Sequence, residues 1–321
     1  MRVAAIDIGS NSIRLLVADV DDRPGGLSVE ARARAGEACR LARGLERSGA
    51  IEESAARRAG ELAAEFVRRA RSLGARHIVV GATAAFRGAR NGDQVAEIIG
   101  KQAGVPVRIL TGDEEARLVY RSVVLGLGRS ASRSACVAFD IGGGSTEVVS
   151  GVGSSAGRWV SLPFGAVSLT ERHLQSDPPS AEEIQAISSE VLSAIMHDCA
   201  SMPSKVPLLV GVGGTVSVLA SMDRGLTSYD PALLDGWCIR PHRLAGLVEQ
   251  VSRSRHEERS GQQVIGEGRA DILVAGVLVV ALLAERFPAP GLVCSMQGLR
   301  YGLVRVAAGE AMGRPDAGAG D

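Results

Sequence analysis

The chain has 321 residues, 45% of them hydrophobic, and its basic and acidic side chains balance to a formal net charge of zero. This length is typical of two domains, and the apolar content excludes a chain that is disordered throughout. Because a neutral chain has no general basic field, we expect no binding to nucleic acid or to anionic membranes, and any bound anion must be held by local groups.

Cysteine usage and hydropathy predict a cytoplasmic protein. The five cysteines are scattered without metal-ligand spacing, which is typical of small buried residues in a reducing compartment. Asp7 interrupts the apolar N-terminus and argues against a signal peptide. The longest apolar run, residues 272–284, is shorter than the ~20 residues of a membrane span, so it predicts a buried helix.

The predicted elements form two similar series of strands and helices. The first series comprises a hairpin over 1–17, strands over 25–39, 77–83 and 105–110, and helices over 53–73, 92–104 and 112–127. The small polar segment 128–134 then marks a boundary. The second comprises a hairpin over 135–149, strands over 157–163, 207–214 and 291–295, and helices over 166–174, 180–200, 215–222, 241–250, 268–287 and from Leu299. We predict domains at 1–128 and 129–309 and a disordered tail at 310–321.

Each series opens with nearly the same phrase. "AIDIGSNSIR" at residues 5–14 and "AFDIGGGSTE" at 138–147 both read Asp-Ile-Gly between apolar runs. Strand, glycine turn and strand is a hairpin pattern. The repeat therefore predicts an α/β fold with two duplicated domains, whose turns face one another across a central cleft.

Three glycine turns carry the groups that could bind phosphate. Glycines let backbone N–H groups converge on an anion, and hydroxyl or amide side chains add donors. A helix N-terminus adds positive potential. A single such turn is more often only a tight turn, but three together favour phosphate binding. The candidate phosphate ligands in these turns are Ser10, Asn11, Ser12, Gly142, Gly143, Gly144, Ser145, Gly213, Gly214 and Thr215.

Two carboxylates end the first strand of each hairpin. Asp7 and Asp140 each precede a glycine turn, where an oxygen ligand could hold a hard cation directly or through water. Mg²⁺ suits such a site because it keeps several waters and binds one or two carboxylates together with substrate phosphates. We therefore predict Asp7 and Asp140 as ligands of Mg²⁺ or Mn²⁺.

Several separate phrases resemble the exopolyphosphatase and guanosine pentaphosphate phosphohydrolase family, within the actin, sugar kinase and heat-shock ATPase superfamily. The resemblance runs from residue 1 to about 306 and implies actin-like (ribonuclease H-like) domains. It rests on "DIGSNSIRLLVADV" (7–20), "ATAAFRGARNG" (82–92), "GDEEARLVYRSV" (112–123), "DIGGGSTE" (140–147), "LPFGAVSLTER" (162–172), "GVGGT" (211–215), "GRADILVAG" (268–276) and "GLRYGLV" (298–304).

The resemblance also implies roles for three further residues. Glu115 matches the proposed general base that activates water, with Glu114 as the second choice, although both could simply favour a helix start. Arg87 matches an arginine that reaches the phosphate chain, although such an arginine is more often a surface ion pair. Glu147 matches an acidic position near the metal and the water, where it could also be a solvated strand residue.

The implied activity is metal-assisted hydrolysis of the terminal phosphoanhydride of inorganic polyphosphate. Guanosine pentaphosphate offers the same terminal anhydride and is the alternative substrate. A non-catalytic regulator that binds either compound, and a kinase of the same superfamily, are the rival functions. Family members often form homodimers, which we expect here too. Since the sequence ends at residue 321 without the C-terminal helical region of longer relatives, we expect a preference for shorter polyphosphates.

Overall fold

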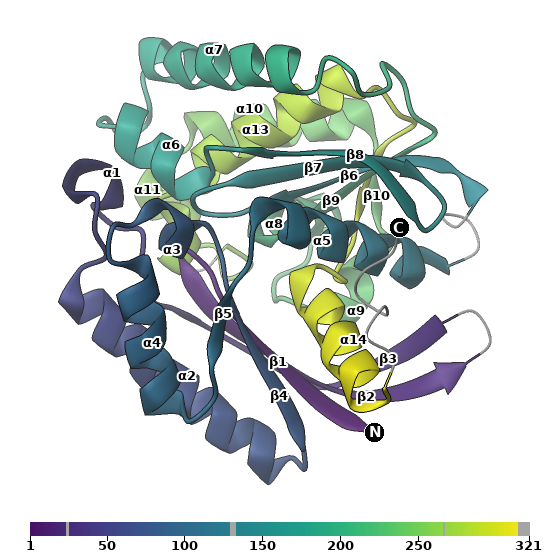
Figure 1. Ribbon diagram of the computed structural model, residues 1–321. Helices are drawn as coiled ribbons and strands as arrows, with labels where there is room; N and C mark the ends of the chain where they lie inside the picture. The colour runs from purple at the N-terminus through teal and green to yellow at the C-terminus, as the bar shows by residue number, and fades with distance from the viewer. Residues whose placement is uncertain (24–25, 129–132, 266, 314–321) are drawn as a thin grey trace. The chain divides into compact units, whose positions relative to one another are not determined.

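The computed structural model describes residues 1–23, 26–128, 133–265 and 267–313. The chain forms two compact units (Figure 1). Unit 1 is Met1–Leu118 with Leu299–Asp321, and unit 2 is Val119–Gly298. Each unit is built around one mixed β-sheet with helices packed against it.

Unit 1 contains a sheet in the order β3-β2-β1-β4-β5. Strands β1, β2 and β3 form antiparallel pairs, whereas β4 and β5 continue the sheet in parallel from β1. Its strands are β1 (Arg2–Ile8), β2 (Ser12–Arg23), β3 (Gly26–Ala38), β4 (His77–Ala82) and β5 (Val107–Ile109). Its helices are α1 (Leu45–Ser48), α2 (Glu53–Ser72), α3 (Ala84–Gly88), α4 (Gly92–Ala103), the start of α5 (Gly112–Leu127) and α14 (Leu299–Ala311).

Unit 2 contains a sheet in the order β10-β11-β9-β6-β7-β8. Its strands are β6 (Ala135–Ile141), β7 (Thr146–Val152), β8 (Ser155–Leu162), β9 (Leu208–Val212), β10 (Cys238–Ile239) and β11 (Leu292–Cys294). Its helices, after the end of α5, are α6 (Ala166–His173), α7 (Ala181–Asp198), α8 (Gly214–Asp223), α9 (Pro231–Leu234), α10 (Pro241–Arg253), α11 (His256–Ser260), α12 (Glu267–Ala270) and α13 (Leu273–Arg286).

The two sheets repeat one topology, which confirms the predicted duplication. In each, the first three strands form an antiparallel meander, and two later strands extend the sheet in parallel from the first. Unit 2 adds β10 at its edge. Each unit is thus an α/β domain, as the sequence predicts.

Helices cover both faces of the central strands, so these strands are apolar without alternation. In unit 1, α2 contacts β1 and β2, while α14 contacts β1 through β4 and lies on the other side of β1 from α2 (Figure 1). In unit 2, α13 packs against α6, α7, α8 and α10, and its side chains enter the main apolar core. The apolar run at 272–284 therefore forms a buried helix, as predicted, and no described helix combines the length and hydropathy that crossing a bilayer requires.

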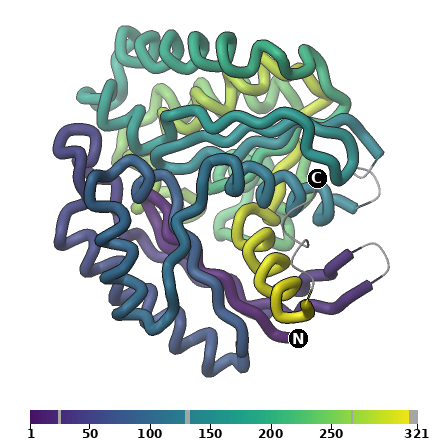
Figure 2. Tube along the Cα trace, viewed as in Figure 1, coloured from purple at the N-terminus to yellow at the C-terminus, as the bar shows by residue number. Residues whose placement is uncertain are grey.

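The end of the chain differs from the sequence prediction. Helix α14 lies beside the N-terminal strand β1 (Figure 2) and is grouped with unit 1, although the sequence placed it in the second domain. Long-range packing of this kind has no local sequence signal. The helix continues to Ala311, into the expected tail, while residues 314–321 lie outside the described residues.

Two further differences are local. The helix predicted at 268–287 is two helices, α12 and α13, separated by a turn in which the Ile272 N–H donates to the Arg269 carbonyl. The short helices α1, α3, α9 and α11 were not predicted, because one helical turn is too short to show periodicity. The predicted boundary segment 128–134 includes residues 129–132, which lie outside the described residues.

We expect Gly302→Ala to destabilise unit 1. A Cβ atom at Gly302 would lie 2.8 Å from both the Cβ and the carbonyl oxygen of Leu118, so α14 would have to move away. Overpacking of this kind costs about 1–3 kcal/mol. Gly246→Ala in α10, where a Cβ would meet no atom within 4 Å, should instead stabilise by up to about 1 kcal/mol through helix propensity. Urea denaturation of both variants measures the contrast, and equal effects would contradict it.

Candidate active site

The first glycine turn is held by its carbonyl groups. The Gly9 N–H donates to the Ser12 carbonyl at 3.0 Å and closes the hairpin. The Ser10 carbonyl accepts from the Ala42 N–H at 2.9 Å, and the Asn11 carbonyl accepts from the N–H groups of Cys39 and Arg40. Segment 39–42, which follows β3, therefore anchors the turn from one side.

The second turn is held in the same way by a helix. The Gly142 N–H donates to the Ser145 carbonyl at 2.9 Å, as in the first turn. The Gly142 carbonyl accepts from Ala166, and the Gly143 carbonyl from Val167 and Ser168, all at the start of α6. A Cβ at Gly165 would lie 2.5 Å from the Gly142 oxygen, so only glycine permits this close approach.

This anchoring orients the N–H groups of both turns. In a trans peptide the carbonyl and the following N–H point in opposite directions. Since the carbonyls of Ser10 and Asn11 point toward segment 39–42, the next N–H groups point away from it, and those of Gly143 and Gly144 likewise point away from α6. Each unit therefore has a turn with the backbone arrangement that suits an anion.

Ser10 adds a polar group to the first turn. Its side chain is buried, and its Oγ has no hydrogen-bond partner among the described residues. A buried hydroxyl without a partner costs about 1–3 kcal/mol, so such groups in native structures call for an explanation. A bound anion or water at the turn would satisfy it, as the sequence prediction for Ser10 requires.

The carboxylate of unit 1 is surrounded by arginines. Asp7 lies directly opposite Arg14 in the β1–β2 register. Burial raises the pKa of the Asp7 carboxyl above its ordinary value, and the nearby charges of Arg14 and Arg300 oppose this rise. Asp7, predicted as a metal ligand, therefore has two cationic neighbours within its own unit.

In unit 2 two carboxylates lie across the hairpin from each other. Asp140 lies directly opposite Glu147 in the β6–β7 register, so the two carboxylates share one face of the sheet. Like charges in directly opposed positions repel. Glu147 is buried and accepts a hydrogen bond from Ser161 Oγ at 2.8 Å, so it is not the solvated strand residue that the sequence allowed.

The third glycine turn lies next to Asp140. Gly213 precedes α8 with φ 98°, and a Cβ there would lie 2.8 Å from Asp140 Oδ1. A Cβ at Gly298 would lie 3.7 Å from Asp140 Oδ2. Gly214 and Thr215 form the first turn of α8. Unit 2 thus brings Asp140, Glu147 and the 213–215 turn together around the same strand ends.

Helix α5 begins with three acidic residues that have different partners. Asp113 pairs with Arg117 on the same helix. Glu114 accepts from the Thr111 N–H at 2.9 Å, while Thr111 Oγ1 accepts from the Glu114 N–H, which completes a capping box. Burial raises the pKa of the Glu114 carboxyl, but the Thr111 hydrogen bonds and the Arg108 guanidinium outweigh it and leave the pKa below its ordinary value.

Glu115 is the buried member of this run. Its side chain points inward, and its Oε2 accepts from Arg87 Nη1 at 2.7 Å. The same nitrogen donates to the Leu110 carbonyl at 2.9 Å. Arg87, which is partly exposed, therefore pairs with a buried carboxylate, whereas its position in the sequence favours a surface ion pair by default.

The donor set of unit 2 fits a hard cation. Asp140 and Glu147 supply only carboxylate oxygens, which Mg²⁺ and Mn²⁺ prefer. Among the described residues no group of three or more histidine, cysteine, aspartate or glutamate side chains could hold a metal ion.

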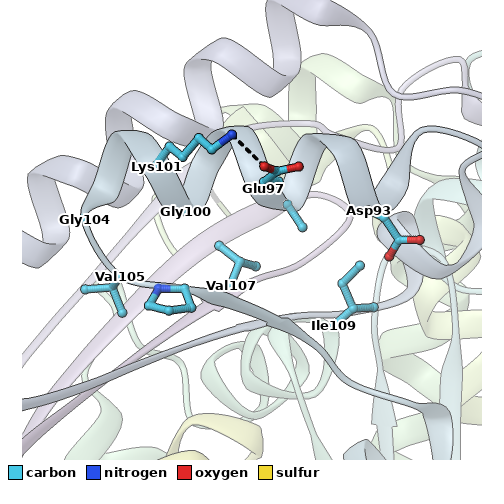
Figure 3. Close-up of a pocket in the computed structure, with 10 residues that line it drawn as sticks. Asp93, Glu97, Gly100, Lys101, Gly104, Val105, Val107 and Ile109 are labelled. Carbon is cyan, nitrogen blue, oxygen red and sulfur yellow. Dashed lines mark ion pairs between the residues drawn. The ribbon is translucent and has the colours of Figure 1, made fainter.

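Two hollows within the units contain none of the predicted site residues. One, of about 570 Å³, lies between α4 and β5, and its lining includes Asp93, Glu97 and Lys101 of α4 and Val107 and Ile109 of β5 (Figure 3). The other, of about 460 Å³, has a mostly apolar lining from α10 and α13. Neither has the converging donors of the glycine turns.

Sequence reasoning missed the residues that hold the turns. Segment 39–42 and the start of α6 act through backbone N–H groups, which leave little trace in side-chain identity. The signal that could have revealed the second anchor is Gly165 in "LPFG", just before a helix. Ser161 could have been found from strand alternation, because it lies opposite Glu147 in the β7–β8 register.

Comparison with known proteins gives a consistent result. The model of the Ppx/GppA phosphatase family matches residues 17–308. Exopolyphosphatase 2 of Mycobacterium tuberculosis is 30% identical over 290 residues, covering 88% of this chain and 90% of the relative. Guanosine-5'-triphosphate,3'-diphosphate pyrophosphatase of Vibrio vulnificus is 28% identical, covering 94% of this chain and 58% of the relative. The crystal structure of the Aquifex aeolicus Ppx/GppA member aligns with a TM-score of 0.79 and 28% identity over 98% of both chains.

We expect Gly213→Ala to disturb Asp140 as well as the backbone. Gly225, with φ +67°, provides a matched control because a Cβ there would meet no atom within 4 Å. Gly225→Ala should lower the free energy of unfolding by about 1 kcal/mol through strain alone. Gly213→Ala should cost about 2 kcal/mol more, because its Cβ overlaps the carboxylate. Denaturant titration measures both, and equal costs would contradict the close contact.

Proposed function

Because this chain belongs to the Ppx/GppA phosphatase family, we propose that it is an exopolyphosphatase that releases orthophosphate from the end of inorganic polyphosphate. The exopolyphosphatase relatives at about 30% identity support this activity. The observation that carries the proposal within this chain is the duplicated turn, whose carbonyls are held so that the N–H groups point the other way. A polyanion needs such donors, whereas a neutral substrate does not.

The reaction is an in-line displacement at the terminal phosphorus. The oxygen of water bonds to that phosphorus, the bridging oxygen leaves with the shortened chain, and orthophosphate is released. Such a transfer depends on positioning and charge stabilisation more than on covalent participation by the protein. In unit 1 the N–H groups of Asn11 and Ser12 would bind phosphate oxygens, and in unit 2 those of Gly143, Gly144 and the 213–215 turn would do so.

Glu115 would orient the attacking water and accept its proton. Among the acidic residues that begin α5, it is the buried one, whereas Glu114 is engaged in the capping box. Asp140 and Glu147 would hold Mg²⁺ or Mn²⁺, which would neutralise charge on the phosphate oxygens. In unit 1, Asp7 remains the predicted metal ligand; it lies opposite Arg14, and the charges of Arg14 and Arg300 offset part of the rise that burial causes in its pKa.

We further propose a cytoplasmic location. The described cysteines are all free, which suits a reducing compartment. The expected homodimer stays a prediction, to be checked by light scattering of the purified protein.

Glu115→Gln should abolish hydrolysis. Loss of a general base typically lowers the rate by about 10²–10⁴-fold, while a neutral isostere preserves shape. Glu114→Gln is the matched control, because glutamine can still accept the Thr111 hydrogen bond and the rate should change little. The assay is orthophosphate release from polyphosphate with Mg²⁺.

The same assay separates the alternatives. Orthophosphate release from guanosine pentaphosphate but not from polyphosphate would identify guanosine pentaphosphate as the substrate. Tight binding of either compound without release would instead favour a regulator. Full activity of Glu115→Gln would remove this residue from the reaction.

Divalent cations should stabilise unit 2 through its opposed carboxylates. We expect Mg²⁺ or Mn²⁺ to raise the melting temperature of the wild-type protein, because it relieves the repulsion between Asp140 and Glu147. Asp140→Asn and Glu147→Gln should lose most of this rise. Glu65→Gln, an exposed change on α2, should keep it. Differential scanning fluorimetry measures the shift, and a full rise in Glu147→Gln would contradict the site.

A further inference from the structure

Arg87 connects three elements of unit 1 through one nitrogen. It lies in the last turn of α3, and its Nη1 donates both to the Leu110 carbonyl, just after β5, and to Glu115 in the first turn of α5. Leu110 is fully buried, and the Glu115 residue is 7% exposed. The guanidinium therefore ties the carboxylate to the buried backbone just after β5.

This pair differs from the other ion pairs at the start of α5. The Arg108 and Glu114 side chains are 54% and 36% exposed, and those of Arg117 and Asp113 are 38% and 44% exposed. The Glu115 side chain is only 9% exposed in its pair with Arg87. Exposed pairs contribute little, but a buried carboxylate needs its partner to stay charged and fixed.

The proposed role of Glu115 requires that its carboxylate keep one position. A glutamate that orients water must hold its carboxylate in one place, although its side chain has several freely rotating bonds. A misplacement of about 1 Å in a reacting group can lower a rate about 100-fold. Arg87 restricts the carboxylate because it is itself restrained by the Leu110 carbonyl.

We propose that Arg87 is a positioning residue, which acts on the reaction through Glu115. This inference rests on the proposed function. It differs from the role that the family resemblance implies for Arg87, and the two roles predict different kinetics.

The first test compares kcat and KM for polyphosphate. A positioning role predicts that Arg87→Ala lowers kcat about 100-fold while KM stays within about 3-fold of wild type. Arg87→Lys keeps a cation near Glu115 and should restore part of kcat. Arg108→Ala, which removes the neighbouring exposed pair, should leave both constants near wild type. A rise in KM with kcat unchanged would overturn the proposal, because it would identify Arg87 as a substrate ligand.

The second test is a double-mutant cycle with Glu115→Gln. If Arg87 acts only through Glu115, Arg87→Lys should lower kcat in the wild-type background but have no further effect on the residual rate of Glu115→Gln. Additive losses would overturn the proposal. Thermal melting shows which variants are folded. If Arg87→Ala does not fold, the cycle is measured with Arg87→Lys alone.

The cycle also separates this inference from the proposed function. A loss of about 10²–10⁴-fold in Glu115→Gln, with additive effects of Arg87→Lys on the residual rate, would leave the function intact and reject the positioning role. Wild-type release in Glu115→Gln would reject the function itself.

Discussion

The fixed direction of the turn carbonyls is the constraint on which the site depends. A glycine-rich turn can adopt many conformations, and most do not point its N–H groups in one direction. In unit 1 the backbone of segment 39–42 binds the carbonyls of Ser10 and Asn11, and in unit 2 the start of α6 binds those of Gly142 and Gly143. Since the peptide is planar, fixing each carbonyl also fixes the next N–H. The scaffold therefore sets the direction of these N–H groups in both turns.

The two units share the anchored hairpin turn but differ in the charges beside it. The hairpin hydrogen bond from Gly9 to Ser12 has its counterpart from Gly142 to Ser145. The residue opposite the strand-end aspartate, however, is Arg14 in one unit and Glu147 in the other. One aspartate therefore faces a cationic side chain across its hairpin, and the other faces a second carboxylate. The shared fold thus places opposite charges at equivalent positions of the two units.

The fold was more predictable from the sequence than the site. Apolar runs and glycine turns predict both hairpins and the parallel strands, because local periodicity determines those elements. The position of α14 on β1 arises from packing between the two ends of the chain, which no local pattern encodes. In the site, the turns could be predicted from their composition. Their anchors could not, because backbone N–H groups of Cys39 or Val167 look the same in any sequence.

The acidic run at the start of α5 shows why residue type alone could not assign the base. Successive residues of a helix are about 100° apart, so Asp113, Glu114 and Glu115 point in three directions. The first lies within reach of Arg117 one turn later, and the second turns back to cap the helix at Thr111. Only the third is directed into unit 1, where Arg87 meets it. A preference for acidic residues at a helix N-terminus therefore accounts for Asp113 and Glu114. It does not account for Glu115, because this residue is buried.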